Sequence, residues 1–325
     1  MKLVSFIVGD DVRAGLVSGD RVIDLHQASG GRLPKEMRGL IELGDEGIAL
    51  MRELSALTGE YALSDLALVS PLPDPVSIRD FYAFEDHVRN ARQRRGLAVV
   101  PEWYEMPVFY FTNHMSVTGP DAPITVPKGS ACLDYELEIS CVIGRKGKDI
   151  PVECAEDHIY GYMIMNDWSA RDLQREEMKV GLGPAKGKDF ATTFGPYLVT
   201  RDELESYREG DRLDLEMTAT VNGVLLSKGN YKEIHYTFSA MIARASENVM
   251  LIPGEVIGSG TVGTGCLLEL GEEVHPWLVP GDVVELGITG LGILKNTISA
   301  REERDHVLSP DGDDPPQASY DVQKR

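Results

Sequence analysis

The sequence predicts an α+β fold rich in β-structure, in which a mixed β-sandwich or roll follows a small N-terminal α+β domain. From Val76 to about Ile298 the chain consists mainly of short β runs, such as ELEISCVIG, YGYMIMND, FGPYLVT, RLDLEMTATVNG, CLLELG and DVVELGITG. Few helical segments separate these runs, which favours packed or closed sheets over a doubly wound parallel sheet. The Asn222-Gly223 pair in VNGVLL predicts a tight hairpin turn.

The chain divides into three predicted regions. Residues 1–70 begin with the strand-like runs KLVSFIV, RAGLVS and RVIDL and continue with a helical segment around GDEGIALMRELSALTG. The segment PLPDP at 71–75 predicts a domain boundary, because proline opposes both a helix and a central strand. Residues 71–302 then form the β-rich domain. The polar, proline-bearing composition of residues 303–325 predicts a disordered tail.

The charge balance argues against nucleic acid and membrane partners. Among 325 residues, 52 Asp and Glu outnumber 32 Lys and Arg, and the formal net charge is −20. Such a surface repels phosphate backbones and anionic lipid faces. No apolar stretch approaches the ~20 residues of a membrane span or has the pattern of a signal peptide. Four cysteines without C-x-x-C spacing favour a reducing compartment, so we expect a cytoplasmic protein.

Carboxylates alternate with apolar residues in the segment LDYELEIS. In an extended strand this alternation places Asp134, Glu136 and Glu138 on one face, with neighbouring Cα atoms of the set roughly 6.5–7 Å apart. Their side chains can therefore converge on one ion. An amphipathic strand with its polar face in water would show the same pattern, and this segment alone does not decide between the two.

A further carboxylate, Asp167, ends the apolar run YGYMIMND, and a side chain at such a strand end can project into a crevice. The following SARD predicts a helix with Ser169 as its N-cap and Asp172 as the partner in a capping box. On that helix Arg171 and Gln174 share a face, so a cation and an amide can point toward whatever Asp167 binds. An ordinary helix start explains the same residues.

The segment IRDFYAFEDHVRN places Asp80 and His87 seven residues apart. A lone histidine is more often a surface or core residue than a base. A stretch of basic residues begins at His87 and contains Arg89, Arg92, Arg94 and Arg95. A solvated helix face explains these arginines, although in so acidic a chain they also suit the binding of a carboxylate substrate.

The segment GSGTVG matches the G-x-G-x-x-G pattern through Gly258, Gly260 and Gly263. The run that follows, CLLELG, looks like a strand, so no helix N-terminus is expected there to bind a pyrophosphate. We interpret these glycines as positions where the backbone approaches a neighbour closely.

These motifs together resemble the fumarylacetoacetate hydrolase family. NDWSARDLQ is similar to the family signature at its metal-binding aspartate, and DYELE to its strand with paired glutamates. IRDFYAFEDH resembles the stretch with a further metal-binding aspartate and, seven residues later, the catalytic histidine. KGKDFATTFGPYLV resembles the lysine loop, and GSGTVGTGCLLE the late glycine-threonine turn followed by a glutamate. The resemblance covers roughly residues 70–300 and implies a domain of the fumarylacetoacetase C-terminal type.

The resemblance also implies a set of site residues. The expected ligands of a hard divalent ion, Mg²⁺ or alternatively Mn²⁺ or Ca²⁺, are Asp80, Glu136, Glu138 and Asp167. All-oxygen ligation agrees independently with these metals rather than zinc. His87 matches the general base and Glu269 the carboxylate that orients it. The groups that match the stabilisers of developing negative charge are Lys188, Arg171 and Gln174. The expected substrate contacts are Tyr82, Tyr110, Arg95 and Thr261.

Two departures from the family pattern concern the substrate. Met178 stands where fumarylacetoacetases carry a tyrosine four residues after the glutamine of the NDWSARDLQ motif, so one phenolic contact is missing. The Arg95-Gly96 pair lies one residue closer to His87 than the corresponding pair of the family. Fumarylacetoacetate is therefore only one of the substrates to consider.

The resemblance implies hydrolysis of a C–C bond in a fumarylacetoacetate-like or acylpyruvate-like 1,3-dioxo acid, a reaction of aromatic catabolism. The alternative on the same metal site is a decarboxylase, hydratase or isomerase of a small 2-oxo acid. Many relatives of that kind lack a ligand like Asp80, so its presence favours hydrolysis. A non-catalytic metal-binding protein would need neither His87 nor Glu269. The resemblance also suggests a homodimer.

Overall fold

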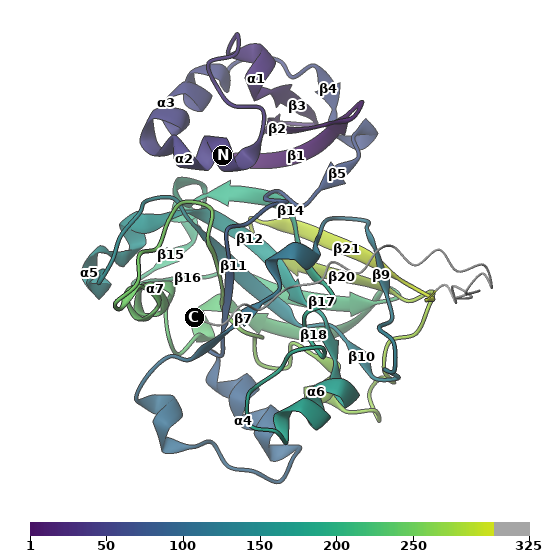
Figure 1. Ribbon diagram of the computed structural model, residues 1–325. Coiled ribbons are helices and arrows are strands. Elements are labelled where there is room, and N and C mark those ends of the chain that lie inside the picture. Colours follow the sequence, from purple (N-terminus) through teal and green to yellow (C-terminus); the bar gives the residue numbers. More distant parts are fainter. Residues whose placement is uncertain (302–325) are drawn as a thin grey trace, which may run out of the picture.

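The structure, a computed structural model, describes residues 1–301, so the predicted disordered tail at 303–325 lies outside the described residues. Two sheets, one of twelve strands and one of five, carry most of the fold, with short helices around them (Figure 1). The predicted β-rich α+β fold is confirmed. No helix within residues 1–301 is long and apolar enough to cross a membrane.

The N-terminal residues form a separate lobe at the top of Figure 1. Its elements are β1 (Lys2–Val8), β2 (Asp11–Ser18), β3 (Arg21–Asp24), α1 (Leu25–Ala28), α2 (Met37–Glu42), α3 (Gly44–Leu54), β4 (Tyr61–Ala62), η1 (Leu63–Asp65) and β5 (Leu68–Val69). The three predicted strands are present, and the helical segment predicted around 44–59 contains the helix α3. Strand β1 pairs with a strand of the second region, so the lobe extends the large sheet. The domain boundary at 71–75 stays a prediction.

The large sheet has the strand order β4-β3-β2-β1-β14-β12-β11-β19-β6-β7, with β5 on β1 and β8 on β14. The strands not yet named are β6 (Ile78–Phe81), β7 (Phe109–Thr112), β8 (Val117–Thr118), β11 (Leu137–Ile143), β12 (Ile159–Asp167), β14 (Thr192–Thr200) and β19 (Val256–Gly258). Segments far apart in the sequence therefore become neighbours at β12, β11, β19 and β6.

The small sheet has the order β18-β17-β20-β21-β9. Its strands are β9 (Pro123–Thr125), β17 (Glu216–Val221), β18 (Val224–Asn230), β20 (Val283–Ile288) and β21 (Gly292–Ser299). Asn222 and Gly223 join β17 to β18 with φ values of 52° and 78°. Two positive φ angles are what a type I′ hairpin requires, so the predicted turn is confirmed.

The remaining elements connect the sheets or flank them. Two ribbons of two strands each pair β10 (Leu133–Asp134) with β13 (Ser169–Ala170) and β15 (Arg208–Glu209) with β16 (Arg212–Leu213). The α-helices are α4 (Glu85–Gln93), α5 (Val152–Ala155), α6 (Arg171–Met178), α7 (Phe238–Ser246) and α8 (Leu267–Leu270). The 3-10 turns are η2 (Pro101–Tyr104), η3 (His114–Ser116), η4 (Glu156–His158), η5 (Arg201–Tyr207) and η6 (Tyr231–Glu233).

Two apolar cores lie on opposite faces of the central strands. Ile139 and Ile164 face one core, which they share with Leu286 of the small sheet. Val142 faces the other core, which includes Leu40 of the N-terminal lobe. Since successive residues of a strand point to opposite faces, β11 has to be apolar on both. This double burial explains the nearly unbroken apolar runs in β11 and β12.

Three local predictions were wrong. The segment LDYELEIS is not one strand: β10 ends at Asp134 and pairs with β13, and β11 starts only at Leu137. Helix α6 begins at Arg171 without a side-chain cap, because Ser169 lies in β13 and donates its hydroxyl to the Asp167 carbonyl. The run CLLELG forms the single helical turn α8 instead of a strand.

A buried ion pair connects strand β6 to the residue directly before strand β19. The Arg79 guanidinium contacts the Glu255 carboxylate, and their side chains are only 7% and 5% exposed. Glu255 also accepts hydrogen bonds from the Ser77 hydroxyl and the Ile252 amide. Strand β6 carries Asp80, so this pair anchors the strand that brings Asp80 into the interior.

We expect Arg79→Ala to lower the free energy of unfolding by about 3–5 kcal/mol, because it leaves the Glu255 charge buried without its partner. The matched control is Arg52→Ala, which removes the Arg52–Asp202 pair, 58% and 48% exposed, and should cost less than about 1 kcal/mol. Urea unfolding of both variants measures the difference. Equal losses in the two variants would show that the buried pair has no special role.

Candidate metal and catalytic site

Three carboxylates meet at one edge of the large sheet. Asp80 lies next to the end of β6, Asp167 ends β12, and Glu138 lies at the beginning of β11. Strand β11 runs antiparallel to β12 and β19, and β6 runs parallel to β19. The start of β11 therefore lies beside the ends of its neighbours, which explains why these three side chains converge.

A glycine between the strands makes this convergence possible. Gly258 of β19 pairs with Asp80, and a Cβ on Gly258 would lie 2.5 Å from the Asp80 Oδ1 atom. The Gly260 amide donates to the same oxygen at 3.2 Å. The interpretation of these glycines as close-approach positions is confirmed, because any larger residue at 258 would displace the carboxylate.

The three carboxylates have the features of a site for a hard cation. Each offers an oxygen within 4.8 Å of the others, and all three side chains are buried. The Glu138 Oε2 and Asp167 Oδ1 atoms have no hydrogen-bond partner within residues 1–301. Burial and the neighbouring carboxylates raise the pKa of Asp80 and Glu138 well above the usual range. An oxygen-only set with free lone pairs fits Mg²⁺, Mn²⁺ or Ca²⁺.

Glu136 lies beside this cluster and is linked to it by Lys188. The Lys188 Nζ atom donates to Glu136 Oε2 at 2.5 Å and to Asp167 Oδ2 at 2.7 Å. Arg171 Nη2 lies 2.8 Å from the other Glu136 oxygen. Although burial opposes it, the charges of Lys188, Arg171 and His87 lower the pKa of Glu136 to about 2. Glu136 is therefore an ionised carboxylate that holds two cations at the edge of the cluster.

The loop that carries Lys188 is shaped by a carboxylate of α6. Glu177 accepts hydrogen bonds from the backbone amides of Ala185, Lys186 and Gly187. The Gly187 carbonyl in turn accepts from the Ala170 amide. These bonds define the backbone directly before Lys188, so the ammonium reaches the carboxylates from a fixed position.

His87 and Glu269 form a buried pair. His87 lies in α4 and Glu269 in α8, and the His87 Nδ1 atom is 2.5 Å from Glu269 Oε1. The Glu269 Oε2 atom accepts from the Thr264 amide at 2.9 Å and from Asn90 Nδ2 at 3.1 Å. Although burial opposes it, the His87 charge lowers the pKa of Glu269. In the neutral tautomer that carries its proton on Nδ1, His87 donates to Glu269 and Nε2 is an acceptor.

Asp134 connects the two halves of the site, a role that the sequence did not reveal. It is fully buried, and its carboxylate accepts from the Leu267 and Leu268 amides at the start of α8. The same carboxylate accepts from Arg171 Nε at 2.8 Å, and Arg171 Nη1 donates to Gln174 Oε1 at 3.1 Å. Asp134 belongs to β10 and is not part of the cluster of Asp80, Glu138 and Asp167.

Two of the expected substrate contacts touch the carboxylates directly. The Tyr110 hydroxyl donates to Asp167 Oδ2 at 2.6 Å, and the Thr261 hydroxyl donates to Glu138 Oε1 at 3.3 Å. The Tyr82 ring meets the His87 ring edge-on, with 5.3 Å between centroids. Burial raises the pKa of Tyr82 to about 12, so its hydroxyl stays protonated and can donate a hydrogen bond.

The arginines of α4 and of the two residues that follow it do not form a common anion-binding cluster. Arg89 pairs with Asp86, and Arg92 and Arg95 donate to backbone carbonyls of their own segment. Arg94 donates to the carbonyls of Glu269 and Leu270 and to the Glu273 carboxylate. Each guanidinium has its own acceptors, as expected of a solvated helix face.

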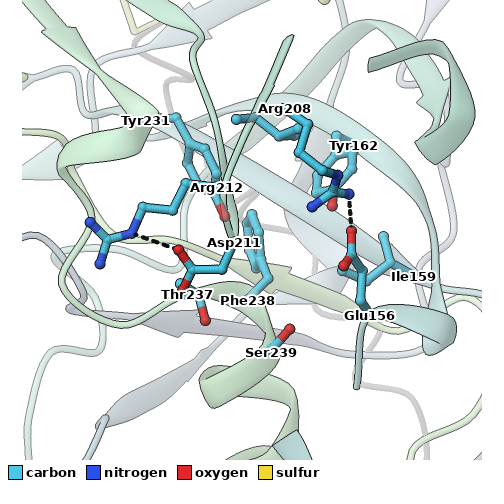
Figure 2. A pocket seen from close by; sticks show the side chains of 11 residues that line it. Glu156, Ile159, Tyr162, Arg208, Asp211, Arg212, Tyr231, Thr237, Phe238 and Ser239 are labelled. Atoms are coloured by element: carbon cyan, nitrogen blue, oxygen red, sulfur yellow. Dashed lines mark hydrogen bonds and ion pairs between the residues drawn. The ribbon is translucent and has the colours of Figure 1, made fainter. Parts of the chain in front are cut away.

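A separate small pocket lies away from these residues (Figure 2). It is lined by Tyr162, Tyr231 and Phe238 together with two ion pairs, Arg208 with Glu156 and Arg212 with Asp211. Its volume of about 20 Å³ is room for one or two water molecules. The charges are already paired and the space is small, so this pocket does not fit an oxo-acid substrate.

Comparison with known proteins agrees with this geometry. Residues 77–299 match the family described as fumarylacetoacetate (FAA) hydrolase C-terminal. Fumarylacetoacetase of Arabidopsis thaliana is 32% identical over 241 residues, which are 59% of this chain and 57% of that protein. The mitochondrial oxaloacetate tautomerase fahd2 of Xenopus laevis is 34% identical over 271 residues, 80% of this chain and 79% of that protein.

Solved structures show the same fold over almost the whole chain. Fumarylacetoacetate hydrolase from the psychrophilic Exiguobacterium antarcticum has a TM-score of 0.68 at 25% identity, with 93% of this chain and all of that chain covered. A protein structure from Mycobacterium smegmatis has a TM-score of 0.76 at 29% identity, with the same coverage. The matched region contains every residue of the site, and the chain belongs to the fumarylacetoacetate hydrolase family.

Proposed function

We propose that this protein is a metal-dependent hydrolase that cleaves a C–C bond in a 1,3-dioxo acid of the fumarylacetoacetate or acylpyruvate type. The observation that carries the proposal is the His87–Glu269 pair beside the buried carboxylates. The proposed ligands Asp80, Glu136, Glu138 and Asp167 do not include a histidine, whereas a histidine held by a carboxylate is suited to act as the general base that activates a water molecule. The Arabidopsis relative, a fumarylacetoacetase by name, supports the same reaction.

His87 is the proposed general base. With Nδ1–H donating to Glu269, Nε2 accepts a proton from water as the water oxygen forms a bond to the substrate carbonyl carbon. Glu269 stabilises the imidazolium that results, because it is ionised and fixed by Thr264 and Asn90. When the C–C bond breaks, its electron pair stays on the carbon between the carbonyls, which then takes up a proton. The products are a carboxylic acid and a shorter oxo acid.

Lys188 and Gln174 stabilise the negative charge that develops in the reaction. The Lys188 ammonium already lies among the carboxylates, and the Gln174 amide nitrogen is free to donate because its oxygen accepts from Arg171. Arg171 has Asp134, Glu136 and Gln174 as partners, so we propose that it acts by orienting Gln174. Tyr82, Tyr110, Arg95 and Thr261 are the proposed substrate contacts.

The ligands proposed for the metal are Asp80, Glu136, Glu138 and Asp167, with Mg²⁺ as the ion. When bound, the ion supplies Lewis acidity toward the oxygens of the dioxo acid. The free oxygens of Glu138 and Asp167 and the raised pKa of Asp80 support this ligand set.

A second function within the family is isomerisation or tautomerisation of a small 2-oxo acid. The Xenopus relative, an oxaloacetate tautomerase by name, is 34% identical over 80% of this chain, which supports this alternative. Such a reaction needs a proton acceptor but no attack by water. Hydrolysis therefore divides the carbon atoms of the substrate between two products, whereas isomerisation or tautomerisation keeps them in one.

We also propose a homodimer in the cytoplasm. Large apolar side chains stay exposed at Phe111, Met115, Val180 and Leu182, at 62%, 81%, 81% and 93% of their surface. Exposed apolar groups of this size favour burial against a second copy of the chain. Light scattering coupled to size-exclusion chromatography measures the mass in solution directly.

Turnover of dioxo acids is the first test. With Mg²⁺ present, acylpyruvates, fumarylpyruvate or fumarylacetoacetate should lose their enol absorbance and give two products. His87→Ala should lower kcat by about 10²–10⁴-fold, because water then lacks its base. The matched control is His158→Ala, at the opposite end of β12, which should leave kcat unchanged.

The outcome also separates the proposed functions. Release of CO₂ from oxaloacetate would indicate decarboxylation, and interconversion of its keto and enol forms without cleavage would indicate tautomerisation. A His87→Ala variant that folds normally and hydrolyses dioxo acids at the wild-type rate would rule out the proposed base.

Asp134→Asn tests whether Asp134 positions both halves of the site. The amide cannot accept two backbone amides and the Arg171 Nε–H as a carboxylate does. We expect Mg²⁺ affinity and kcat each to fall by about 10–100-fold. The control is Asp172→Asn, since Asp172 accepts hydrogen bonds from Ser130, Ala131 and Leu173, which are not proposed site residues. A Mg²⁺ affinity equal to that of wild type would show that Asp134 does not support the ligands.

The pH dependence of stability tests the buried carboxylates. A carboxyl whose pKa is raised in the folded state binds its proton more tightly there, so folding loses stability as pH rises above the ordinary values of 3.8 for Asp80 and 4.5 for Glu138. Mg²⁺ requires the ionised form. The increase in Tm caused by saturating Mg²⁺ should therefore grow between about pH 5 and pH 8. An increase that is independent of pH, or equally large in Asp80→Asn, would contradict the assignment.

A further inference from the structure

A thiol lies against the His87–Glu269 pair and has no part in water activation. Cys266 is fully buried, and its Sγ atom is 3.5 Å from Glu269 Oε1, the same oxygen that contacts His87. A ring nitrogen of His87, the thiol sulfur and a carboxylate oxygen all lie within 4.8 Å of one another. A nitrogen, a sulfur and an oxygen that can each bind a metal therefore lie close together.

The local fold holds these donors in place. Cys266 is the N-cap of α8 and Glu269 follows three residues later, so both side chains lie on one side of a single helical turn. The Glu269 Oε2 atom is engaged by Thr264 and Asn90, which turns Oε1 toward the other two donors. His87 comes from α4, which packs against α8.

Nitrogen, sulfur and oxygen donors together are a ligand set for Zn²⁺ or Cd²⁺ and not for Mg²⁺, because a thiolate prefers a softer ion. Zinc bonds of roughly 2.0–2.3 Å in tetrahedral geometry bring neighbouring donors to roughly 3.3–3.8 Å from each other. The three donor atoms already lie within 4.8 Å of one another. Shifts of about 1 Å in their positions would give the distances of a zinc site, with water as the fourth ligand.

Solvent reaches the site from one side. A hollow of about 460 Å³ is bordered by Asn90, Gln93 and Arg94, and Glu269 forms part of its wall. An ion can enter by this route without passing through the cluster of Asp80, Glu138 and Asp167.

We propose that His87, Cys266 and Glu269 form a second metal site, which binds Zn²⁺ or Cd²⁺ and is distinct from the carboxylate site for a hard ion. On binding, the His87 Nδ1–H···Glu269 hydrogen bond is replaced by metal bonds, and the Nδ1 and thiol protons pass to solvent. No oxidation or reduction takes place. One consequence rests on the proposed function. Zn²⁺ inhibits turnover, because His87 and Glu269 cannot activate water while they bind the ion.

The test uses the full chain with saturating Mg²⁺ and Co²⁺ as a spectroscopic probe. Wild type should show the near-ultraviolet charge-transfer absorption of a Co²⁺–thiolate bond, and Cys266→Ser should not. The control is Cys154→Ser, which removes an exposed thiol and should retain the absorption. In equilibrium dialysis, the affinity of Cys266→Ser for Zn²⁺ should be at least about tenfold lower than that of wild type. Even the loss of a group that only supports a metal ligand lowers metal affinity by about 10–100-fold.

Two further measurements separate this site from the proposed reaction. The first is the Zn²⁺ concentration that halves the rate which each protein shows with Mg²⁺ alone. This concentration should be at least about tenfold higher for Cys266→Ser than for wild type. Loss of the Co²⁺–thiolate absorption in Cys154→Ser, or equal Zn²⁺ affinity in wild type and Cys266→Ser, would overturn the second site. Thiolate absorption in a protein that turns over no dioxo acid would support the site and contradict only the proposed reaction.

Discussion

The burial of like charges at one edge of the large sheet is the constraint on which the rest of the structure depends. Asp80, Glu138 and Asp167 come from three strands that lie close together in the large sheet, and all three residues are buried. Such a group is stable only with a proton, a cation or several hydrogen bonds. Lys188 supplies one cation, and Glu136 helps to hold it. Burial and the neighbouring carboxylates raise the pKa of Asp80 and Glu138 although Lys188 lies in the same cluster, and a divalent ion that replaced their protons would supply positive charge there.

The same edge of the sheet is connected to the proposed base by short polar links. Asp134 binds Arg171 on one side, and Arg171 reaches Glu136. On its other side Asp134 accepts the first amides of α8, the turn that carries Glu269. The position of the proposed metal ligands and that of the His87–Glu269 pair are therefore not independent.

The fold was largely predictable from the sequence, and parts of the site were not. Patterning predicted the N-terminal strands, the helical segment around 44–59 and the Asn222-Gly223 hairpin, because each depends on local periodicity or turn chemistry. It failed at Ser169, since pairing of β13 with β10 overrides a local capping motif. It also could not separate Asp134 from Glu136 and Glu138, because alternation assumes one continuous strand and the chain changes sheets at Tyr135. The contact between Cys266 and Glu269 depends on α8, a helical turn that looked like a strand in the sequence.

The central claim is that the carboxylates of β6, β11 and β12 bind one hard divalent ion, and an anomalous-difference map from crystals grown with Mn²⁺ tests it most directly. The account predicts one strong peak at the edge of the large sheet, roughly 2.0–2.6 Å from oxygens of Asp80, Glu138 and Asp167. Glu136 should be either a direct ligand or linked to the ion through water. A map without a peak between these side chains, or with peaks only at surface carboxylates, would contradict the account.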